Sequence, residues 1–301
     1  MTVALKALSR PQFALLLERV EGIGRVTSNR ILRQFRDLDD LRRFPREQLL
    51  LRLAGLPKAE QTVGHLFDDS YLGELAKSVD AELAECRRRR VVVCDAEDAA
   101  YPARLTSLKD SERPTVIYLF GEPLSETHPV VAVLGHPPLV PAYFDNAQRI
   151  VEGLAKNACT IVLAAKTGFD VAMAKRAVGV GGRVVLVAES GLDLMPREIR
   201  PTASLVVKSG GTVTTSFPFG HGPFEHDAGE RVLLMAAMAN AVLICDERPA
   251  PYVVSAARWS MANRRSVFSF TEGADIEGAH VLRDEDDEDW LRAAAAGAGD
   301  P

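Results

Sequence analysis

Residues 130–135, VVAVLG, and residues 160–170, TIVLAAKTGFD, decide the fold class of this chain. Each begins with an apolar run rich in β-branched residues and then reaches a glycine-containing turn. Such runs are typical of strands buried on both faces of a parallel sheet. From residue 101 onward, strand-like runs alternate with helical patterns; the strand candidates are 116–120, 130–134, 160–163, 183–187, 205–207, 213–215, 242–245 and 266–270, and the helix candidates are 143–156, 169–178, 226–239 and 253–262. The alternation predicts a doubly wound α/β domain, whose ligands bind beyond the carboxyl ends of the strands.

The two ends of the chain differ from this central region. Residues 1–90 show helical patterns: Val26, Ile31, Leu32 and Phe35 recur at helical spacing, with arginines between them. We therefore expect an all-helical domain over 1–90, the α/β domain over 91–272 and a frayed acidic tail over 273–301. The net charge is +5 over residues 1–60 and −8 over residues 272–301, within −5 for the whole chain. The basic end is a candidate for contact with phosphates.

Composition excludes several classes of protein. An apolar share of 47% and a charged share of 26% are ordinary for a globular chain. The four cysteines form no CxxC pair and no Cys/His cluster with zinc spacing, so we expect neither a metal nor a disulfide. No apolar run approaches the roughly 20 residues of a membrane helix. We expect a soluble, cytoplasmic protein with no cofactor.

A glycine-containing turn, Glu21-Gly22-Ile23-Gly24, lies between two helical runs near the start of the chain. Two glycines permit a tight hairpin whose backbone N–H groups can face a phosphate. The turn resembles the helix-hairpin-helix module, which grips the nucleic-acid backbone without reading bases. Under that interpretation Gly22, Gly24, Arg25 and Arg30 contact DNA; the alternative is that the hairpin is a plain packing unit.

Several strings in the central region resemble the motifs of one family. Tyr101-Pro102-Ala103-Arg104-Leu105 and the VIYLFG of residues 116–121 look like "YP..L" and "LY..G". The VAVLG of residues 131–135 stands in the place of "VAIVGSR", and the IVLAAKTGFD of residues 161–170 is similar to "IVSGLARGID". Further strings follow in the same order: GLDLMP at 191–196, FPFG at 217–220, GERV at 229–232 and AVLI at 241–244. In order and spacing they resemble the DNA-processing protein A (DprA/Smf) family.

The resemblance implies an extended Rossmann-like, mostly parallel sheet that binds single-stranded DNA. It further implies a homodimer that loads a RecA-type recombinase during natural transformation, with no catalytic step. In this chain, cations at the strand ends would neutralise phosphates and the amides of the turns would add hydrogen bonds. The candidate DNA-binding residues are Gly135, His136, Lys166, Gly168, Asp170, Lys175, Arg176 and Arg231. The candidates for stacking on bases are Phe169, Phe217, Phe219 and Tyr252, of which Phe169 is expected in the core.

The chain departs from the family pattern at the same putative site. Its residues differ from the family's at Pro137, Leu163, Thr167, Gly229 and Glu230. Pro137 and Gly229 replace arginines, which can bind phosphate bidentately. We therefore expect weaker DNA binding than in a member with the intact motifs.

Two other functions remain open at this point. One is a nucleotide-sensing or nucleotide-cleaving Rossmann-like protein of the SLOG type, although no GxGxxG or GxxxxGKS motif occurs. The other is a scaffold that binds a protein partner and no nucleic acid. Two acidic residues also have a purely structural interpretation in place of a functional one. Asp170 would cap a helix, and Asp246 would lie in a solvated loop.

Overall fold

The computed structural model describes residues 8–53, 55, 58–136, 139–271, 276–283 and 287–297. It divides into two compact units. The first comprises Met1–Tyr101 and Leu108–Ile117, and the second comprises Pro102–Ser107 and Tyr118–Pro301. Strand β1 (Val91–Cys94), which the sequence pattern assigned to the α/β domain, is grouped with the first unit.

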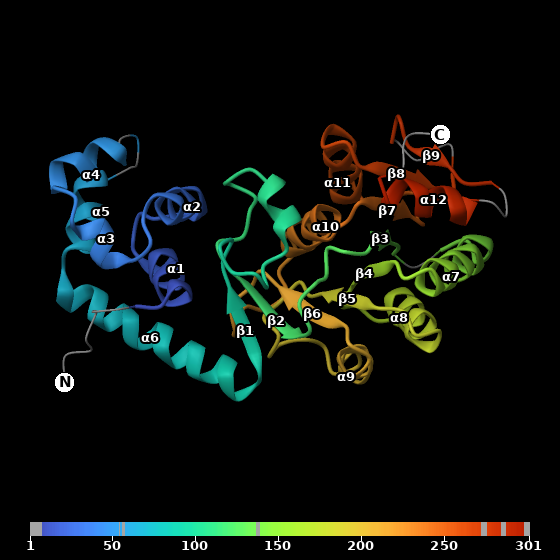
Figure 1. Ribbon diagram of the computed structural model, residues 1–301, viewed down its shortest axis with the longest axis horizontal. Helices are drawn as coiled ribbons and strands as arrows, with labels where there is room; N and C mark the ends of the chain where they lie inside the picture. Colours follow the sequence, from blue (N-terminus) through green and yellow to red (C-terminus); the bar gives the residue numbers. More distant parts are fainter. Residues whose placement is uncertain are drawn as a thin grey trace. The chain divides into compact units, whose positions relative to one another are not determined.

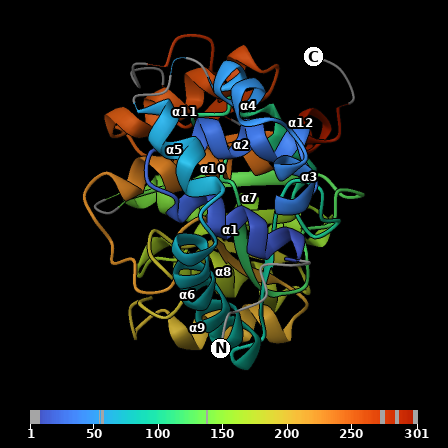
Figure 2. The same cartoon turned by 90° about the vertical axis from the view of Figure 1, so that its left-hand side faces the viewer.

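The first unit is built from helices, as its sequence predicts. They are α1 (Arg10–Arg19), α2 (Arg25–Gln34), α3 (Leu38–Arg42), α4 (Arg46–Arg52), α5 (Ala59–Leu66) and α6 (Asp69–Arg88). Helix α1 begins at a capping box, in which Ser9 and Gln12 bind each other's backbone N–H groups. Helix α1 packs against α2 and α6, and α4 packs against α5 (Figure 2).

The turn between α1 and α2 is held by packing. Gly22 has a φ of +88°, and a Cβ added there would lie 2.3 Å from the Thr62 hydroxyl oxygen. Glycine is therefore required at this position by the turn and by α5. Gly24 is the N-cap residue of α2, Arg25 donates to the Glu112 carbonyl at 3.5 Å, and Arg30 is exposed. DNA contact by this hairpin stays a prediction.

The second unit contains a mostly parallel sheet. Its strands are β2 (Ile117–Gly121), β3 (Val130–Leu134), β4 (Thr160–Ala164), β5 (Val184–Val187), β6 (Thr212–Thr215), β7 (Ala241–Ile244), β8 (Ser266–Ser269) and β9 (His280–Val281). They lie in the order β2-β6-β5-β4-β3-β7-β8-β9. Strand β2 is antiparallel to β6, and the pairs from β6 to β9 are parallel. The predicted Rossmann-like α/β fold is confirmed.

Helices cover both faces of this sheet (Figure 1). One face carries α7 (Pro141–Lys156), α8 (Phe169–Gly179), α9 (Arg200–Lys208) and α12 (Asp287–Ala295). The other carries α10 (Asp227–Met238) and α11 (Pro251–Ala262), while a short 3-10 helix, η1 (Ala103–Ser107), packs on α10. Because both faces are covered, strands such as β3, β4 and β7 are buried at every residue, which explains their continuous apolar runs.

Two expectations from the sequence pattern are wrong. Residues 205–207 form the last turns of helix α9 and not a strand. Val206 is buried while Leu205 is exposed, which is the one-sided burial of a helix and not the two-sided burial of a central strand. The tail is not frayed throughout, since the ranges 276–283 and 287–297 contain β9 and α12, and Leu291 of α12 is fully buried in the core.

The described part of the chain carries no helix long and apolar enough to cross a membrane. In the same residues, no group of three or more His, Cys, Asp or Glu side chains is arranged to hold a metal ion. All four cysteines are buried with their thiols unlinked.

Candidate functional site

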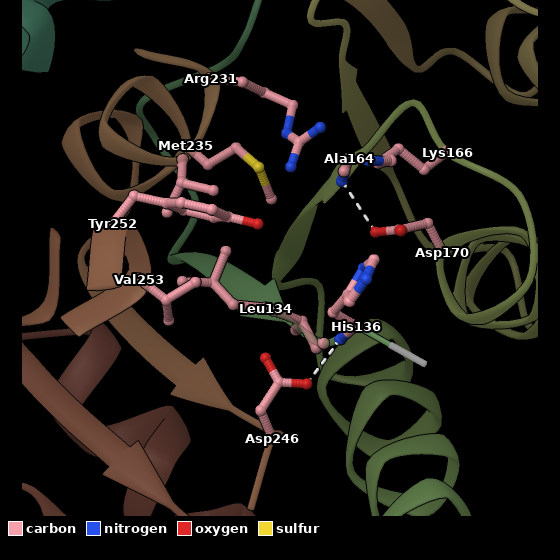
Figure 3. A pocket seen from close by; sticks show the side chains of 13 residues that line it. Leu134, His136, Ala164, Lys166, Asp170, Arg231, Met235, Asp246, Tyr252 and Val253 are labelled. Carbon is pink, nitrogen blue, oxygen red and sulfur yellow. Dashed lines mark hydrogen bonds between the residues drawn. The ribbon is translucent and has the colours of Figure 1, made fainter. Parts of the chain in front are cut away.

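The order in which strands are added to the sheet reverses at strand β3. Strands β4, β5 and β6 follow on one side of β3, and β7, β8 and β9 follow on the other. A cavity of about 30 Å³ opens where the carboxyl ends of β3, β4 and β7 meet, with α10 and α11 as its far wall (Figure 3). In doubly wound sheets this switch point is where ligands bind. The fold therefore places a small polar pocket at the position that the architecture favours.

The ends of β3 and β7 are joined at this pocket. The backbone N–H of His136 donates to Asp246 Oδ1 at 2.6 Å, and Figure 3 shows the two residues side by side at the base of the cavity. Asp246 is buried, and burial raises the pKa of its carboxyl, while the bond from His136 opposes that rise. The expectation of a solvated loop at Asp246 is therefore wrong.

A second buried carboxylate faces the cavity from α8. Asp170 accepts a hydrogen bond from the backbone N–H of Ala164 at 2.9 Å. Burial raises the pKa of Asp170 to about 7, although the charges of Arg231 and Lys166 and that hydrogen bond all lower it. Gly168 is the N-cap residue of α8, so the expectation that Asp170 caps this helix is wrong; its carboxylate reaches back to β4 instead.

A charged triad forms the rim of the pocket. Lys166 Nζ lies 3.2 Å from Glu189 Oε1, and Arg231 Nη1 donates to Glu189 Oε2. Arg231 is 5% exposed, and its Nε has no hydrogen-bond partner in the described part of the chain. Figure 3 shows the guanidinium of Arg231 at the top of the cavity, opposite Asp246. The buried arginine thus keeps one N–H that the protein itself does not satisfy.

A larger, mostly apolar cavity adjoins the triad. It measures about 190 Å³ and lies beyond the carboxyl ends of β4 and β5. Lys166 lines both cavities, and Glu189 lines this second one together with Thr167, Met195 and Pro196. A cavity of roughly 150 Å³ suffices for a six-membered ring such as benzene. The triad therefore separates a small polar pocket from a space large enough for a planar ring.

The pocket brings together five of the predicted site residues: Gly135, His136, Lys166, Asp170 and Arg231. Lys175 and Arg176 line neither cavity, and Arg176 pairs with Glu152 of α7. Lys175, predicted together with Lys166 and Arg231 to bind DNA, therefore does not line the pocket that the other two line. Gly168 lines a separate hollow beside Phe144. Pro137 lies outside the described residues.

Only one of the stacking candidates faces the pocket. Tyr252 lines it from α11, with its hydroxyl toward the cavity in Figure 3. Phe169 is 1% exposed, as expected of a core residue. Phe217 is buried and stacks on His221, and Phe219 stacks on Tyr118. Aromatic stacking at this site therefore depends on Tyr252 alone among the four predicted residues.

Comparison with known proteins identifies the family. Residues 92–286 match the model of the DNA recombination-mediator protein A family. The chain belongs to this family. Protein Smf of Synechocystis sp. (strain ATCC 27184 / PCC 6803 / Kazusa) is 24% identical over 279 residues, which are 91% of this chain and 68% of that protein.

Two solved structures of family members share the fold. DNA processing protein A from Streptococcus pneumoniae superposes with a TM-score of 0.57 at 18% identity, over 84% of this chain and 86% of that chain. DNA processing protein A from Helicobacter pylori, described with a single-stranded DNA binding mode, gives a TM-score of 0.51 at 18% identity, over 64% of this chain and 84% of that chain. The predicted DprA/Smf resemblance is confirmed.

Three features of the site were not found from the sequence of this family member. Neither Glu189 nor Met235 of α10 is among the residues that the sequence predicts for the site, and Asp246 is predicted to lie in a solvated loop. The position of Glu189 two residues after β5 is the only signal that the sequence offers for its part in the triad. The altered family positions are structurally accommodated: Leu163 is buried in β4, and Glu230 accepts a hydrogen bond from Ser216 at 2.7 Å.

Proposed function

We propose that this member of the DNA recombination-mediator protein A family binds single-stranded DNA at the carboxyl ends of strands β3, β4, β5 and β7. The observation that carries the proposal is the buried Arg231, whose Nε is unsatisfied at a pocket on the switch point of the sheet. A buried guanidinium with a spare donor favours an anionic ligand, and phosphate is the anion that arginine recognises best. The family and the described binding mode of the Helicobacter pylori relative favour DNA as the source of that phosphate.

The two cavities suggest how a strand would be held. Lys166 and Arg231 would bind a backbone phosphate, because both line the small pocket and Lys166 also lines the larger cavity. The 190 Å³ cavity would hold one base, which would pack against its apolar walls. The small pocket has room for one or two waters or phosphate oxygens, but not for a nucleoside. This arrangement favours an extended strand over an enclosed free nucleotide.

We propose two further properties from the family alone. Bound to single-stranded DNA, the protein would load a RecA-type recombinase, and it would do so as a homodimer. Both would be measured directly, by recombinase filament formation on coated DNA and by light scattering of the purified protein. A monomer that leaves filament formation unchanged contradicts both properties, and it leaves the DNA-binding proposal intact.

The test of DNA binding is fluorescence anisotropy of a labelled oligo(dT) strand, titrated at several salt concentrations. Lys166→Ala should weaken binding roughly threefold to tenfold for all sequences alike, because it removes one charge-assisted contact to phosphate. It should also lower the salt slope by about 0.7, the value for one phosphate of a single strand. Lys208→Ala is the matched control, since Lys208 is exposed at the end of α9, toward the amino end of β6.

Competition with free nucleotides separates the alternatives. If dTMP displaces the oligonucleotide as effectively per molecule as unlabelled oligo(dT), the ligand is a nucleotide and not a strand. If neither ligand binds at low salt, the DNA-binding proposal is wrong, and a scaffold that binds a protein partner becomes the better interpretation.

A further inference from the structure

We propose that Glu189 is an internal competitor of the ligand: its carboxylate occupies the anion position between Lys166 and Arg231, and an anionic ligand binds only by taking its place. This inference rests on the proposed function for the identity of the ligand, but not for the existence of the anion position. It assigns to Glu189 the control of affinity and charge preference at the site.

The geometry of the triad is that of an occupied anion site. Each carboxylate oxygen of Glu189 holds one cation, with Oε1 3.2 Å from Lys166 Nζ and Oε2 bound by Arg231 Nη1. The two cations come from different elements, the loop after β4 and helix α10. A phosphate offers the same two-point pairing through two of its oxygens. The carboxylate and a phosphate therefore compete for the same donors.

The difference in burial between Arg231 and Glu189 indicates which of the two side chains can move. The side chain of Arg231 is 6% exposed, whereas that of Glu189 is 21% exposed. The backbone on either side of Glu189 is anchored, because Ala188 N–H donates to Thr214 O at 2.9 Å and Gly191 N–H donates to His221 O at 2.8 Å. The ligand can therefore replace Glu189 by rotation of one side chain toward solvent, without movement of the sheet or of Arg231.

The exchange leaves no buried arginine unpaired. Removing the Glu189 carboxylate from Arg231 without replacement would be strongly unfavourable, since a buried charge would lose this partner. A phosphate restores the pair and offers a further oxygen to the unsatisfied Nε. The remaining charged groups at the pocket, Asp170 and Asp246, repel a second anion. Acetate offers only the two oxygens that Glu189 already supplies, and chloride offers a single contact, whereas a phosphate has a third oxygen for the unsatisfied Nε of Arg231.

The decisive variant is Glu189→Gln, which keeps the size of the side chain and removes its charge. It should bind labelled oligo(dT) about tenfold more tightly than the wild type, because the ligand no longer has to displace a carboxylate, with a similar salt slope, because the same phosphate is neutralised in both proteins. Glu189→Asp should give a smaller gain, because the shorter carboxylate cannot reach both cations.

The chain supplies a matched control in Glu152 of α7. Its carboxylate also bridges a lysine and an arginine, Lys156 at 2.7 Å and Arg176 at 2.5 Å, and its side chain is likewise 21% exposed. Glu152 lines neither cavity. Glu152→Gln therefore removes the same charge from the same kind of bridge, and it should change the affinity for oligo(dT) less than twofold.

A second readout separates this inference from the proposed function. The melting temperature of each variant is measured with and without inorganic phosphate, which should stabilise Glu189→Gln more than the wild type or Glu152→Gln. If oligo(dT) binds the wild type, but binds Glu189→Gln and Glu189→Asp no more tightly, the inference is overturned and the proposed function stands. If no protein binds oligo(dT), but phosphate selectively stabilises Glu189→Gln, the anion position stands and the DNA-binding proposal is wrong. If neither effect is seen, both are wrong.

Discussion

His136 and Asp246 are joined by a hydrogen bond of 2.6 Å, from the backbone N–H of the first to the carboxylate of the second. The two residues follow β3 and β7, which are neighbours in the sheet although about 110 residues separate them in the chain. The bond therefore sets the spacing of the two loops at the switch point. Since Asp246 is 6% exposed, the carboxylate contributes as part of the pocket wall and not as a surface charge.

We expect Asp246→Ala to destabilise the protein by about 1–2 kcal/mol, because the N–H of His136 loses its partner and a buried space is left. Asp246→Asn should retain most of the stability, since its amide oxygen can accept the same bond. Urea unfolding of the three proteins measures the difference. Equal midpoints for Asp246→Ala and the wild type would show that the bond does not hold the two loops.

Asp170 should make stability fall as the pH rises. Its folded-state pKa is raised from 3.8 to about 7, so between these values the folded chain keeps a proton that the unfolded chain has lost. Stability from this group is complete below pH 3.8, declines by about 1.4 kcal/mol per pH unit at most, and levels off above pH 7. Asp170→Asn removes this decline and keeps an acceptor for Ala164. The difference between the urea stabilities of the two proteins should therefore change with pH from 4.5 to 7, and a constant difference contradicts the prediction.

Protonation of Asp170 should also raise the affinity for DNA. Below pH 7 the neutral Asp170 no longer opposes a phosphate at Arg231, so we expect affinity for oligo(dT) to rise from pH 8 to pH 6. Anisotropy of labelled oligo(dT) at pH 6 and pH 8 measures this rise. Asp170→Asn, which cannot titrate, should show a smaller change in affinity between the two pH values, and an unchanged pH dependence in Asp170→Asn would contradict the prediction.

The sequence predicts the strands that surround this site, and the positions that follow them, better than it predicts which charged side chains pair there. The apolar runs of β3, β4, β5 and β7 are evident because strands covered on both faces carry mostly apolar residues. The positions that follow such strands are then also known, and they include Lys166 and Asp170. The pairing of Lys166 and Arg231 with Glu189 is not predictable in this way, because it joins side chains from three separate elements.

The errors in the helices and strands have a similar cause. Residues 205–207 are apolar and two of the three are β-branched, as in a strand, but Pro201 lies in the first turn of a helix and only one side of that helix is buried. In the tail, Leu291 and Ala295 are four residues apart and pack into the core as one helical face, but the acidic run before them makes this apolar spacing hard to detect in the sequence. Both segments are decided by what they pack against: α9 packs on α8, β5 and β6, and α12 packs on α7, β7 and β8.

Gly229→Arg should strengthen DNA binding. This position in α10 carries an arginine in the family motif, and a Cβ added there would meet Tyr252 at 3.6 Å, an ordinary contact. Arginine also favours a helix over glycine by about 0.5–1 kcal/mol. We expect roughly tenfold tighter binding of oligo(dT) and a salt slope about 0.7 steeper, measured by anisotropy. Gly229→Gln is the neutral control, and equal affinities for the two variants would show that the lost arginine does not explain weak binding.

Gly135 follows β3 because Phe169 leaves no room for a side chain. A Cβ at Gly135 would lie 2.7 Å from the ring of Phe169, which is 1% exposed and packs edge-on against Phe144 with 6.1 Å between ring centroids. The ring cannot retreat, so we expect Gly135→Ala to cost about 1–3 kcal/mol. Phe169→Leu alone should cost a similar amount through the cavity that it leaves.

Combining the two changes separates packing from ligand approach. The smaller Leu side chain makes room for the new methyl group, so Gly135→Ala with Phe169→Leu should be more stable than the sum of the single variants by about 0.5–3 kcal/mol in urea unfolding. Additive losses would show that Phe169 is not the obstacle. Because the added Cβ points at Phe169, the double variant should also bind oligo(dT) like the wild type. Recovered stability with lost binding would mean instead that the glycine is needed for a close approach of the phosphate to the backbone at His136.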